Sequence, residues 1–194
     1  MARRRTSDEG IALPDLLMAL LLTLTMLTMA VPFTSRARDT HEARGAAAYL
    51  ASRVREVRLA AVASNRTVAL VFDQGPAGWA LRRCSDGNGN GVRRAELAGG
   101  PDDCRAGQQL AGLLGISLGL DPTVPGIDEP AGRTDGVRFG RSAMTSCSPA
   151  GHCTPGTLYL RSPGGQQFAV RVAPVMGRTR LFRFDPAGRR WEPL

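Results

Sequence analysis

The sequence GIALPD, Gly10 to Asp15, runs directly into the sixteen uncharged residues LLMALLLTLTMLTMAV, Leu16 to Val31. As a helix that rises about 1.5 Å per residue, the segment from Ile11 to Val31 reaches roughly 31 Å, which matches the hydrocarbon core of a bilayer. Arginines at positions 3–5 precede the segment, and cationic residues ahead of a first span keep that side in the cytoplasm. The sequence therefore predicts a transmembrane helix over residues 11–32, with a cytoplasmic N-terminus and the rest of the chain outside.

Asp15 is an ionisable residue near the start of this apolar segment, where an unpaired carboxylate costs free energy. A cut after Gly10 would give Ile11 a free α-amino group, with which the Asp15 carboxylate of a neighbouring subunit could pair. This arrangement resembles the class III leader of type IV pilins and type II secretion pseudopilins, in which Gly precedes the cut and a carboxylate lies fifth after it. Those proteins usually have Phe after the cut and Glu at the fifth place, where this chain has Ile11 and Asp15. Pro32 falls where their helices commonly carry a kink-forming proline.

The resemblance implies that residues 1–10 are a leader removed by a prepilin peptidase, that Ile11 is then N-methylated, and that Asp15 is used in assembly. Two other interpretations remain open, a secretory signal peptide cleaved near Ala30 and a plain single-span anchor. The acidic residues at positions 8 and 9 do not suit the basic start of a signal peptide. The plain anchor gives no reason for the Gly and Asp of the leader pattern.

Residues 65–194 provide enough chain for one globular domain, which the orientation places in the periplasm. It holds all four cysteines of the chain, Cys84, Cys104, Cys147 and Cys153, in a compartment where disulfides form. Sequence allows three pairings, and the local ones, Cys84 with Cys104 and Cys147 with Cys153, are favoured because each closes a loop rich in Gly, Asp, Ser and Pro. Zinc binding is the weaker alternative, since there is no CxxC motif and His152 is the only histidine beside a cysteine.

The charge of the chain is strongly positive, with a formal net charge of +8 and with arginine as the only basic residue besides histidine. The stretch from Arg161 to the C-terminus holds seven arginines against two acidic residues. Such a surface attracts phosphate backbones or acidic partners, although charged residues on exposed strands are often only solvated.

The segment 33–64 has the pattern of an amphipathic helix. Apolar residues recur at alternating steps of four and three, with arginines between them; they are Ala43, Ala47, Leu50, Val54, Val57 and Ala61. We expect one long helix that ends near Ser64, is softly interrupted near Pro32 and at Gly45, and packs its apolar stripe on a sheet.

Beyond Arg66 the periodicity favours strands. Residues 67–72 and 78–83 form a predicted hairpin around the Gly75-Pro76 turn. Further strands are expected at 110–120, 137–141, 157–161, 167–173 and 178–184, with a loop at 121–135. The predicted fold class is α+β and pilin-like: a long N-terminal helix, transmembrane in its first half, packed on an antiparallel β-sheet domain.

The chain is also similar to the GspH/FimT group of minor pseudopilins and pilins in several local signatures. They are Arg58-Leu-Ala-Ala-Val-Ala-Ser-Asn65, the Asp86-Gly-Asn-Gly-Asn-Gly91 loop, Val137-Arg-Phe-Gly140, Gly156-Thr-Leu-Tyr-Leu160 and Gly177-Arg-Thr-Arg180. The resemblance implies a minor pseudopilin of a type II secretion system, a structural subunit of the periplasmic pseudopilus in protein export. Its partners would be other pseudopilin or pilin subunits, the prepilin peptidase and the inner membrane. The alternative is a FimT-like minor type IV pilin that binds DNA during natural transformation.

Asp86, Asn88, Asn90 and Gly91 match the opening of a calcium loop, in which alternate oxygen side chains converge on the cation. The closing acidic residue is expected at position 97, however, and the nearest one stands one place early. A Gly/Asn hairpin turn is the favoured interpretation. We expect no other cofactor.

Arg178 and Arg180 lie two residues apart on a predicted strand, so that their guanidinium groups would face the same way about 7 Å apart. Arginine forks suit phosphate oxygens, and in FimT-like competence pilins a Gly-Arg-x-Arg motif of this form is associated with DNA binding. The alternative is that Gly177 makes a turn while both arginines are solvated or paired with Asp185.

The sequence gives little support for catalysis. His41 lies on the predicted helix and His152 lies between two cysteines, and neither the Gly-x-Ser-x-Gly pattern nor a nucleotide-binding loop is present. A nonenzymatic role is therefore expected.

Overall fold

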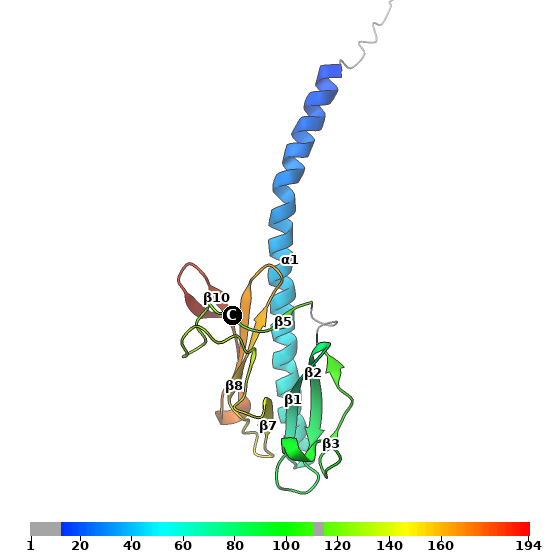
Figure 1. Ribbon diagram of the computed structural model, residues 1–194, viewed down its shortest axis with the longest axis vertical. Coiled ribbons are helices and arrows are strands. Elements are labelled where there is room, and N and C mark those ends of the chain that lie inside the picture. Colours follow the sequence, from blue (N-terminus) through cyan, green and yellow to red (C-terminus); the bar gives the residue numbers. More distant parts are fainter. Residues whose placement is uncertain (1–12, 111–114) are drawn as a thin grey trace, which may run out of the picture. The chain divides into compact units, whose positions relative to one another are not determined.

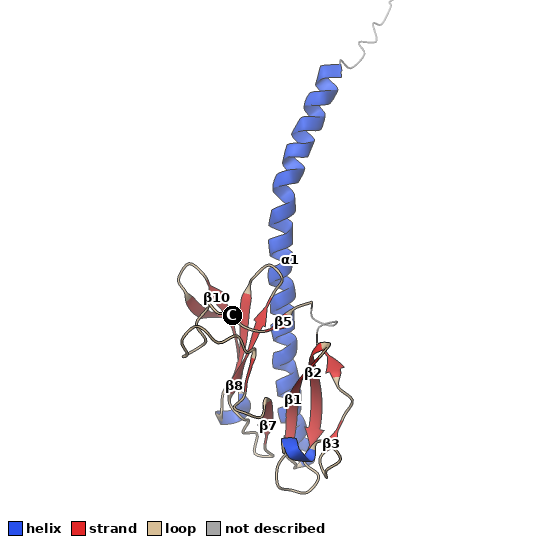
Figure 2. Ribbon diagram, in the orientation of Figure 1, coloured by secondary structure: helices blue, strands red, loops and turns tan. Residues whose placement is uncertain are grey.

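The computed structural model describes residues 13–110 and 115–194, apart from the side chains of residues 27–36 and 175. The chain divides into two compact units, one that ends at Arg38 and one from Asp39 to Leu194. The second unit is α+β, with a helix packed on antiparallel sheets (Figure 2). The predicted fold class is confirmed at this level.

Helix α1 spans Leu13–Ser64, and neither Pro32 nor Gly45 ends it. Its C-terminus closes on Asn65, which adopts a left-handed φ of 51°. The N–H of Arg66 then donates to the carbonyl of Ala61 at 3.3 Å, the hydrogen bond that a residue in this conformation permits after a helix. The predicted end at Ser64 is therefore confirmed.

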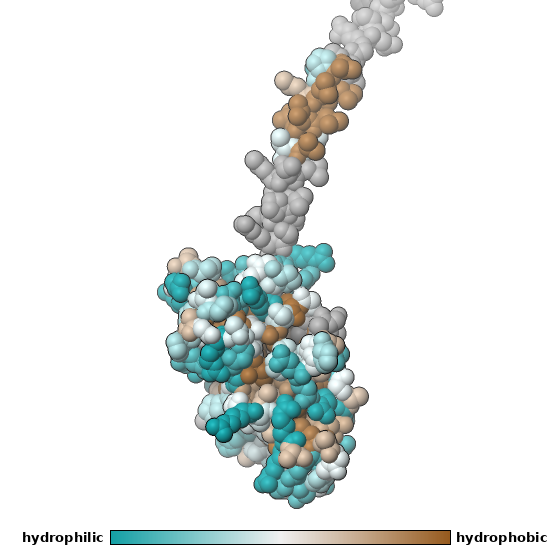
Figure 3. Space-filling view, viewed as in Figure 1, coloured by the Kyte–Doolittle hydropathy of each residue, from teal (hydrophilic) through white to brown (hydrophobic). Residues whose placement is uncertain are grey.

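The first unit contains the described start of α1, whose large apolar side chains are exposed (Figure 3). Across the residues that the structure describes, no helical stretch combines the length and the hydropathy that crossing a bilayer needs. The predicted span, residues 11–32, extends at both ends beyond the described side chains, and it stays a prediction.

In the second unit, α1 buries one stripe of its surface. Every residue of the predicted stripe is 1% exposed or less, namely Ala43, Ala47, Leu50, Val54, Val57 and Ala61. Ala46 and Ala51 widen it. These small and branched side chains let strands of both sheets pack closely on this one face of the helix (Figure 1).

Sheet A has the strand order β3-β2-β1-β7, and β4 also pairs with β2. The strands are β1 Val68–Gly75, β2 Gly78–Ser85, β3 Asp103–Cys104, β4 Gln108–Gln109 and β7 Met144–Cys147. A two-residue turn joins β1 to β2, with Gly75 opposite Gly78, whose φ is 95°. Only glycine takes up such a φ readily, and the predicted hairpin is confirmed.

Sheet B has the strand order β11-β10-β9-β8-β5, and β6 also pairs with β8. The strands are β5 Ser117–Leu118, β6 Val137–Arg138, β8 Gly156–Arg161, β9 Gln167–Val172, β10 Thr179–Asp185 and β11 Arg190–Pro193. Two short 3-10 helices, η1 Arg94–Glu96 and η2 Val175–Gly177, lie in connections.

One hydrophobic core joins α1 to both sheets. Along β9, Phe168, Val170 and Val172 point into this core, whereas Ala169 and Arg171 point to the other face of sheet B. That outer face carries a smaller cluster of its own, which includes Tyr159. In the described part of the chain, one face of sheet B therefore packs on α1 and the other face packs on a loop.

Two strand predictions need correction. Among the described residues of 110–120, only Ser117–Leu118 form a strand, and Gly115 has a φ of 60° that interrupts an extended backbone. The strand expected at 137–141 stops at Arg138, and Gly140 turns the chain with a φ of 59°. Four strands were not predicted at all: β3, β4, β7 and β11.

Candidate functional site

Asp15 lies in the first turn of α1, where the unpaired backbone N–H groups of a helix favour an acidic side chain. The carboxylate is exposed, and so are the apolar side chains that follow it. The predicted cleavage site, Gly10 and Ile11, lies outside the described residues. The pairing of the Ile11 amine with Asp15 therefore stays a prediction.

Both local disulfides that the sequence favoured are present. Cys84 and Cys104 stand opposite each other on β2 and β3, and their bond spans 20 residues of chain. Cys147, at the end of β7, is bonded to Cys153 across six residues. Each disulfide closes an excursion that has little regular structure of its own.

The Asp86 carboxylate organises the first of these excursions. Its Oδ1 accepts the N–H groups of Asn88 at 3.1 Å and Gly89 at 2.7 Å, and its Oδ2 accepts that of Gly91 at 2.7 Å. Burial by itself raises the pKa of the Asp86 carboxyl, but the hydrogen bonds from Gly91, Gly89, Asn88 and Asn90 outweigh it. The net result is a pKa below the ordinary value.

The two asparagines of the predicted calcium loop turn their amide nitrogens toward one carboxylate. The Nδ2 of Asn88 donates to Glu96 at 2.9 Å, and that of Asn90 donates to it at 3.0 Å. In the described part of the chain, no three His, Cys, Asp or Glu side chains gather in a way that could hold a metal ion. The hydrogen bonds are those of a Gly/Asn turn, and calcium binding stays a prediction.

The two arginines of the Gly-Arg-x-Arg motif lie on the outer face of sheet B. Arg178 has an extended backbone, and its carbonyl accepts the N–H of Ala173 at 2.9 Å, which continues the pairing of β9 with β10 by one residue. Arg180 on β10 stands opposite Arg171 on β9. Because side chains two apart on a strand share a face, all three arginines point away from α1. We call Arg171, Arg178 and Arg180 the basic strip.

Of the three arginines of the basic strip, one is paired with a carboxylate. Arg171 forms an ion pair with Asp128, with 2.6 Å between Nη1 and Oδ2. Among the described residues, neither Arg178 nor Arg180 has a carboxylate partner, and both are exposed. Asp185, the partner considered from the sequence, instead accepts backbone N–H groups in the turn after β10.

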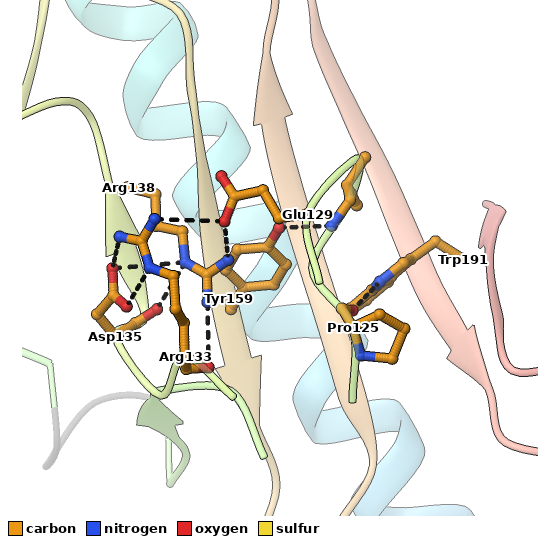
Figure 4. Close-up of polar contacts among 8 residues, drawn as sticks. Pro125, Glu129, Arg133, Asp135, Arg138, Tyr159 and Trp191 are labelled. Atoms are coloured by element: carbon orange, nitrogen blue, oxygen red, sulfur yellow. Dashed lines mark hydrogen bonds and ion pairs between the residues drawn. The ribbon is translucent and has the colours of Figure 1, made fainter. Parts of the chain in front are cut away.

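Residues 120–135, which we call the covering loop, are fastened to the outer face of sheet B (Figure 4). The Arg138 side chain is only 6% exposed, and its guanidinium lies 4.5 Å from the centre of the Tyr159 ring. It forms ion pairs with Glu129 at 2.5 Å and Asp135 at 3.4 Å. The Tyr159 hydroxyl accepts the N–H of Ile127 at 2.7 Å. Backbone and side chains of the loop are thus held together.

A second contact holds the first half of the covering loop. The indole Nε1 of Trp191 on β11 donates to the carbonyl of Pro125 at 2.8 Å (Figure 4). Burial raises the pKa of the Tyr159 hydroxyl above its ordinary value, although the Ile127 hydrogen bond and the nearby guanidinium act in the opposite direction. The phenol therefore stays protonated as an acceptor of the backbone N–H.

Sequence reasoning missed Arg171, Asp128 and Arg138. The register of β9 with β10 brings Arg171 beside the Gly-Arg-x-Arg motif, and a hairpin between residues 167–173 and 178–184 would have indicated that neighbour. The pairing of Asp128 has no local signal, because 43 residues separate it from Arg171.

Comparison of this chain with protein-family models, with curated proteins and with solved structures gives no match.

Proposed function

We propose that this protein is a minor pseudopilin of a type II secretion system, a nonenzymatic subunit of the periplasmic pseudopilus used in protein export. The precursor inserts through residues 11–32 in the inner membrane, with its N-terminus in the cytoplasm and its β-rich domain in the periplasm. A prepilin peptidase cuts after Gly10, and Ile11 is N-methylated. The mature subunit then assembles with other pseudopilin or pilin subunits.

The observation that carries this proposal is the exposed apolar surface at the start of α1. Nine large apolar side chains between Leu13 and Met26 are more than half exposed. A continuous apolar surface of this kind requires a lipid or protein partner, because it is too large for a monomer in water. Asp15 lies within it, as expected for a carboxylate that a neighbouring subunit's terminal amine would neutralise.

The second unit supports the periplasmic location. It holds two disulfides, and disulfides persist in oxidising compartments rather than in the cytosol. The helix stripe, the hairpin and the α+β plan also agree with the group that the local signatures resemble.

Mass spectrometry of the protein purified from cells with a prepilin peptidase tests the proposal. We expect mature material that begins with methylated Ile11, and uncut material when Gly10 is replaced by Val. Protein that still begins at Met1, or that begins at Val31, would overturn the assignment. Asp15→Ala should be cut normally yet fail to assemble, whereas Asp15→Glu, which keeps the carboxylate, should assemble.

A second candidate function is DNA capture by a minor type IV pilin, with Arg178 and Arg180 as phosphate contacts. It is favoured by the exposure of both guanidinium groups and by their position beside Arg171. Arginines placed in this way can neutralise successive phosphates.

The test is binding of a labelled DNA duplex to the full chain in a neutral detergent. Neutralising two phosphate contacts with Arg178→Gln and Arg180→Gln should make the dependence of log K on log salt shallower by about two. The matched control replaces exposed Arg44 and Arg105 by Gln and so removes the same charge elsewhere. If both double variants change the salt dependence of DNA binding equally, the DNA hypothesis is wrong.

A further inference from the structure

The outer face of sheet B carries an internal anion beside the basic strip. Asp128 belongs to the covering loop, and its carboxylate contacts the Arg171 guanidinium at 2.6 Å. Arg171 in turn stands directly opposite Arg180, so two like charges face each other across the β9–β10 pair. Such a pair is destabilising unless an anion lies near it. Asp128 is that anion in the free protein.

The backbone at Asp128 is held in place beside Arg171. Asp128 has a φ of 62°, a left-handed conformation that few residues other than Gly, Asn and Asp adopt. Its neighbours on both sides are fixed: the Ile127 N–H donates to Tyr159, and the Glu129 carboxylate pairs with Arg138 (Figure 4). The covering loop therefore keeps Asp128 at Arg171 without depending on the Asp128–Arg171 ion pair itself.

Access from solvent is open at the same place. The Asp128 side chain is 72% exposed and that of Arg171 is 44% exposed. Both line a hollow of about 420 Å³ between the covering loop and strands β8 and β9. An exposed ion pair of this kind contributes little stability, so an external anion can replace one partner at small cost.

We infer that Asp128 is an intramolecular competitor for Arg171, and that a DNA phosphate displaces it to make Arg171 a third contact of the basic strip. This inference rests on the second candidate function, because it assumes that the strip binds DNA. In the free protein Asp128 lowers the positive potential beside Arg180. On binding, the phosphate takes the Arg171 guanidinium, and the Asp128 carboxylate turns to water.

The test measures binding of a labelled duplex to the full chain in neutral detergent, as a function of salt. Asp128→Asn should bind about two- to fivefold more tightly, since an exposed ion pair of ordinary strength is released. Its salt dependence should equal that of the wild type, because Arg171 contacts a phosphate in both complexes. Asn tolerates the left-handed φ at this position, and Asp128→Gly, which tolerates it too, should give the same gain.

A double variant separates release of Arg171 from a general change in charge. In an Arg171→Gln background, Asp128→Asn should give no gain, because there is no guanidinium to release. The matched control is Asp103→Asn, an exposed acid on β3 of sheet A, which adds the same charge and should leave binding unchanged.

The outcomes distinguish this inference from the function on which it rests. A gain that persists without Arg171, or that Asp103→Asn reproduces, overturns the role of Asp128, as does the lack of any gain in a chain whose binding depends on Arg178 and Arg180. If replacing Arg178 and Arg180 leaves wild-type binding intact, DNA capture itself fails.

Discussion

The Asp86 carboxylate holds an otherwise irregular loop in one conformation, because it accepts three backbone N–H groups of that loop. Asp86 is only 5% exposed. We expect Asp86→Ala to lower the free energy of unfolding by about 1–3 kcal/mol, because these donors lose a charged acceptor. Urea unfolding measures the change. Exposed Asp103→Ala is the control and should alter stability little.

The acid sensitivity of the fold has a definite sign. The pKa of Asp86 is lowered in the folded state, and so is that of Asp73, where burial raises it but hydrogen bonds from Arg82 and Arg94 outweigh that effect. The unfolded chain therefore binds more protons than the folded chain near pH 4. The stabilisation is present above about pH 4 and is lost as the pH falls through the lowered values.

Urea midpoints measured between pH 7 and pH 2 check this prediction. They should fall steeply below about pH 4 in the wild type and less steeply in Asp86→Asn, which has no carboxyl to protonate. A midpoint that does not change over this range, or an equally steep fall in the variant, would contradict the assignment.

A sequence predicts the chemistry of a single side chain better than it predicts the partners of that side chain. The spacing of Asp86, Asn88 and Asn90 indicated a turn or a calcium loop, and the hydrogen bonds describe the turn. The Asp102 carboxylate, which accepts the N–H groups of Gly87 and Arg93, was not foreseen. Its partners depend on how the loop returns, and no local pattern encodes that.

The covering loop offers a prediction at the scale of a structural element. Tyr159→Phe removes the hydroxyl that accepts the Ile127 N–H, and it leaves a partly buried donor unsatisfied. We expect the free energy of unfolding to fall by about 1–3 kcal/mol and hydrogen exchange at the Ile127 amide to become faster. Tyr49→Phe is the matched control, because it also removes one hydroxyl but from an exposed contact with Gln108. Unchanged exchange at Ile127 would show that Tyr159 does not hold the loop.

Helix α1 provides a second such prediction, because leucines on its two faces differ in burial. Leu50 is fully buried in the core that α1 shares with both sheets, and Leu59 is 67% exposed. Leu50→Ala should destabilise the protein by about 2–5 kcal/mol through lost burial and a residual cavity. Leu59→Ala should change the free energy of unfolding by less than about 0.5 kcal/mol. Similar losses in thermal or urea unfolding would refute the predicted packing face.

Elements with a regular pattern were predictable, and elements made by context were not. The stripe of α1 and the β1–β2 hairpin follow from periodicity and turn residues alone. The apolar segment 110–120 has the pattern of a strand, and periodicity does not reveal that Gly115 leaves the extended conformation. The two-residue strands β3 and β4 form only because β2 is there to pair with them.

For the molecule as a whole, the two disulfides should contribute unequally. Cross-linking restricts the unfolded chain more when the closed loop is longer, which gives about 3 kcal/mol for the Cys84–Cys104 loop and about 2 kcal/mol for Cys147–Cys153. Replacing a cysteine pair by Ala should lower the melting temperature more for Cys84–Cys104 than for Cys147–Cys153. Calorimetry of both variants checks it, and the reverse order would mean that effects other than loop closure dominate.

The sequence predicted a single α+β domain but not its division into two sheets. Alternation along a strand shows which residues are buried, yet it does not show which sheet a strand joins. That assignment comes from long-range pairs such as β1 with β7, whose partners are separated by some seventy residues of chain. The shared core around α1 is the feature that makes both sheets one folding unit.

This shared core has a practical consequence for anyone who wishes to produce the second unit without the exposed apolar start of α1. A shortened chain that begins at Val68 would lack α1, and the core-facing sides of both sheets would be exposed to solvent. A chain that begins at Asp39 keeps Ala43 through Ala61 and therefore keeps the helix surface on which the strands pack. The part of α1 from Asp39 onward thus belongs to the second unit, and a truncation should not extend beyond Arg38.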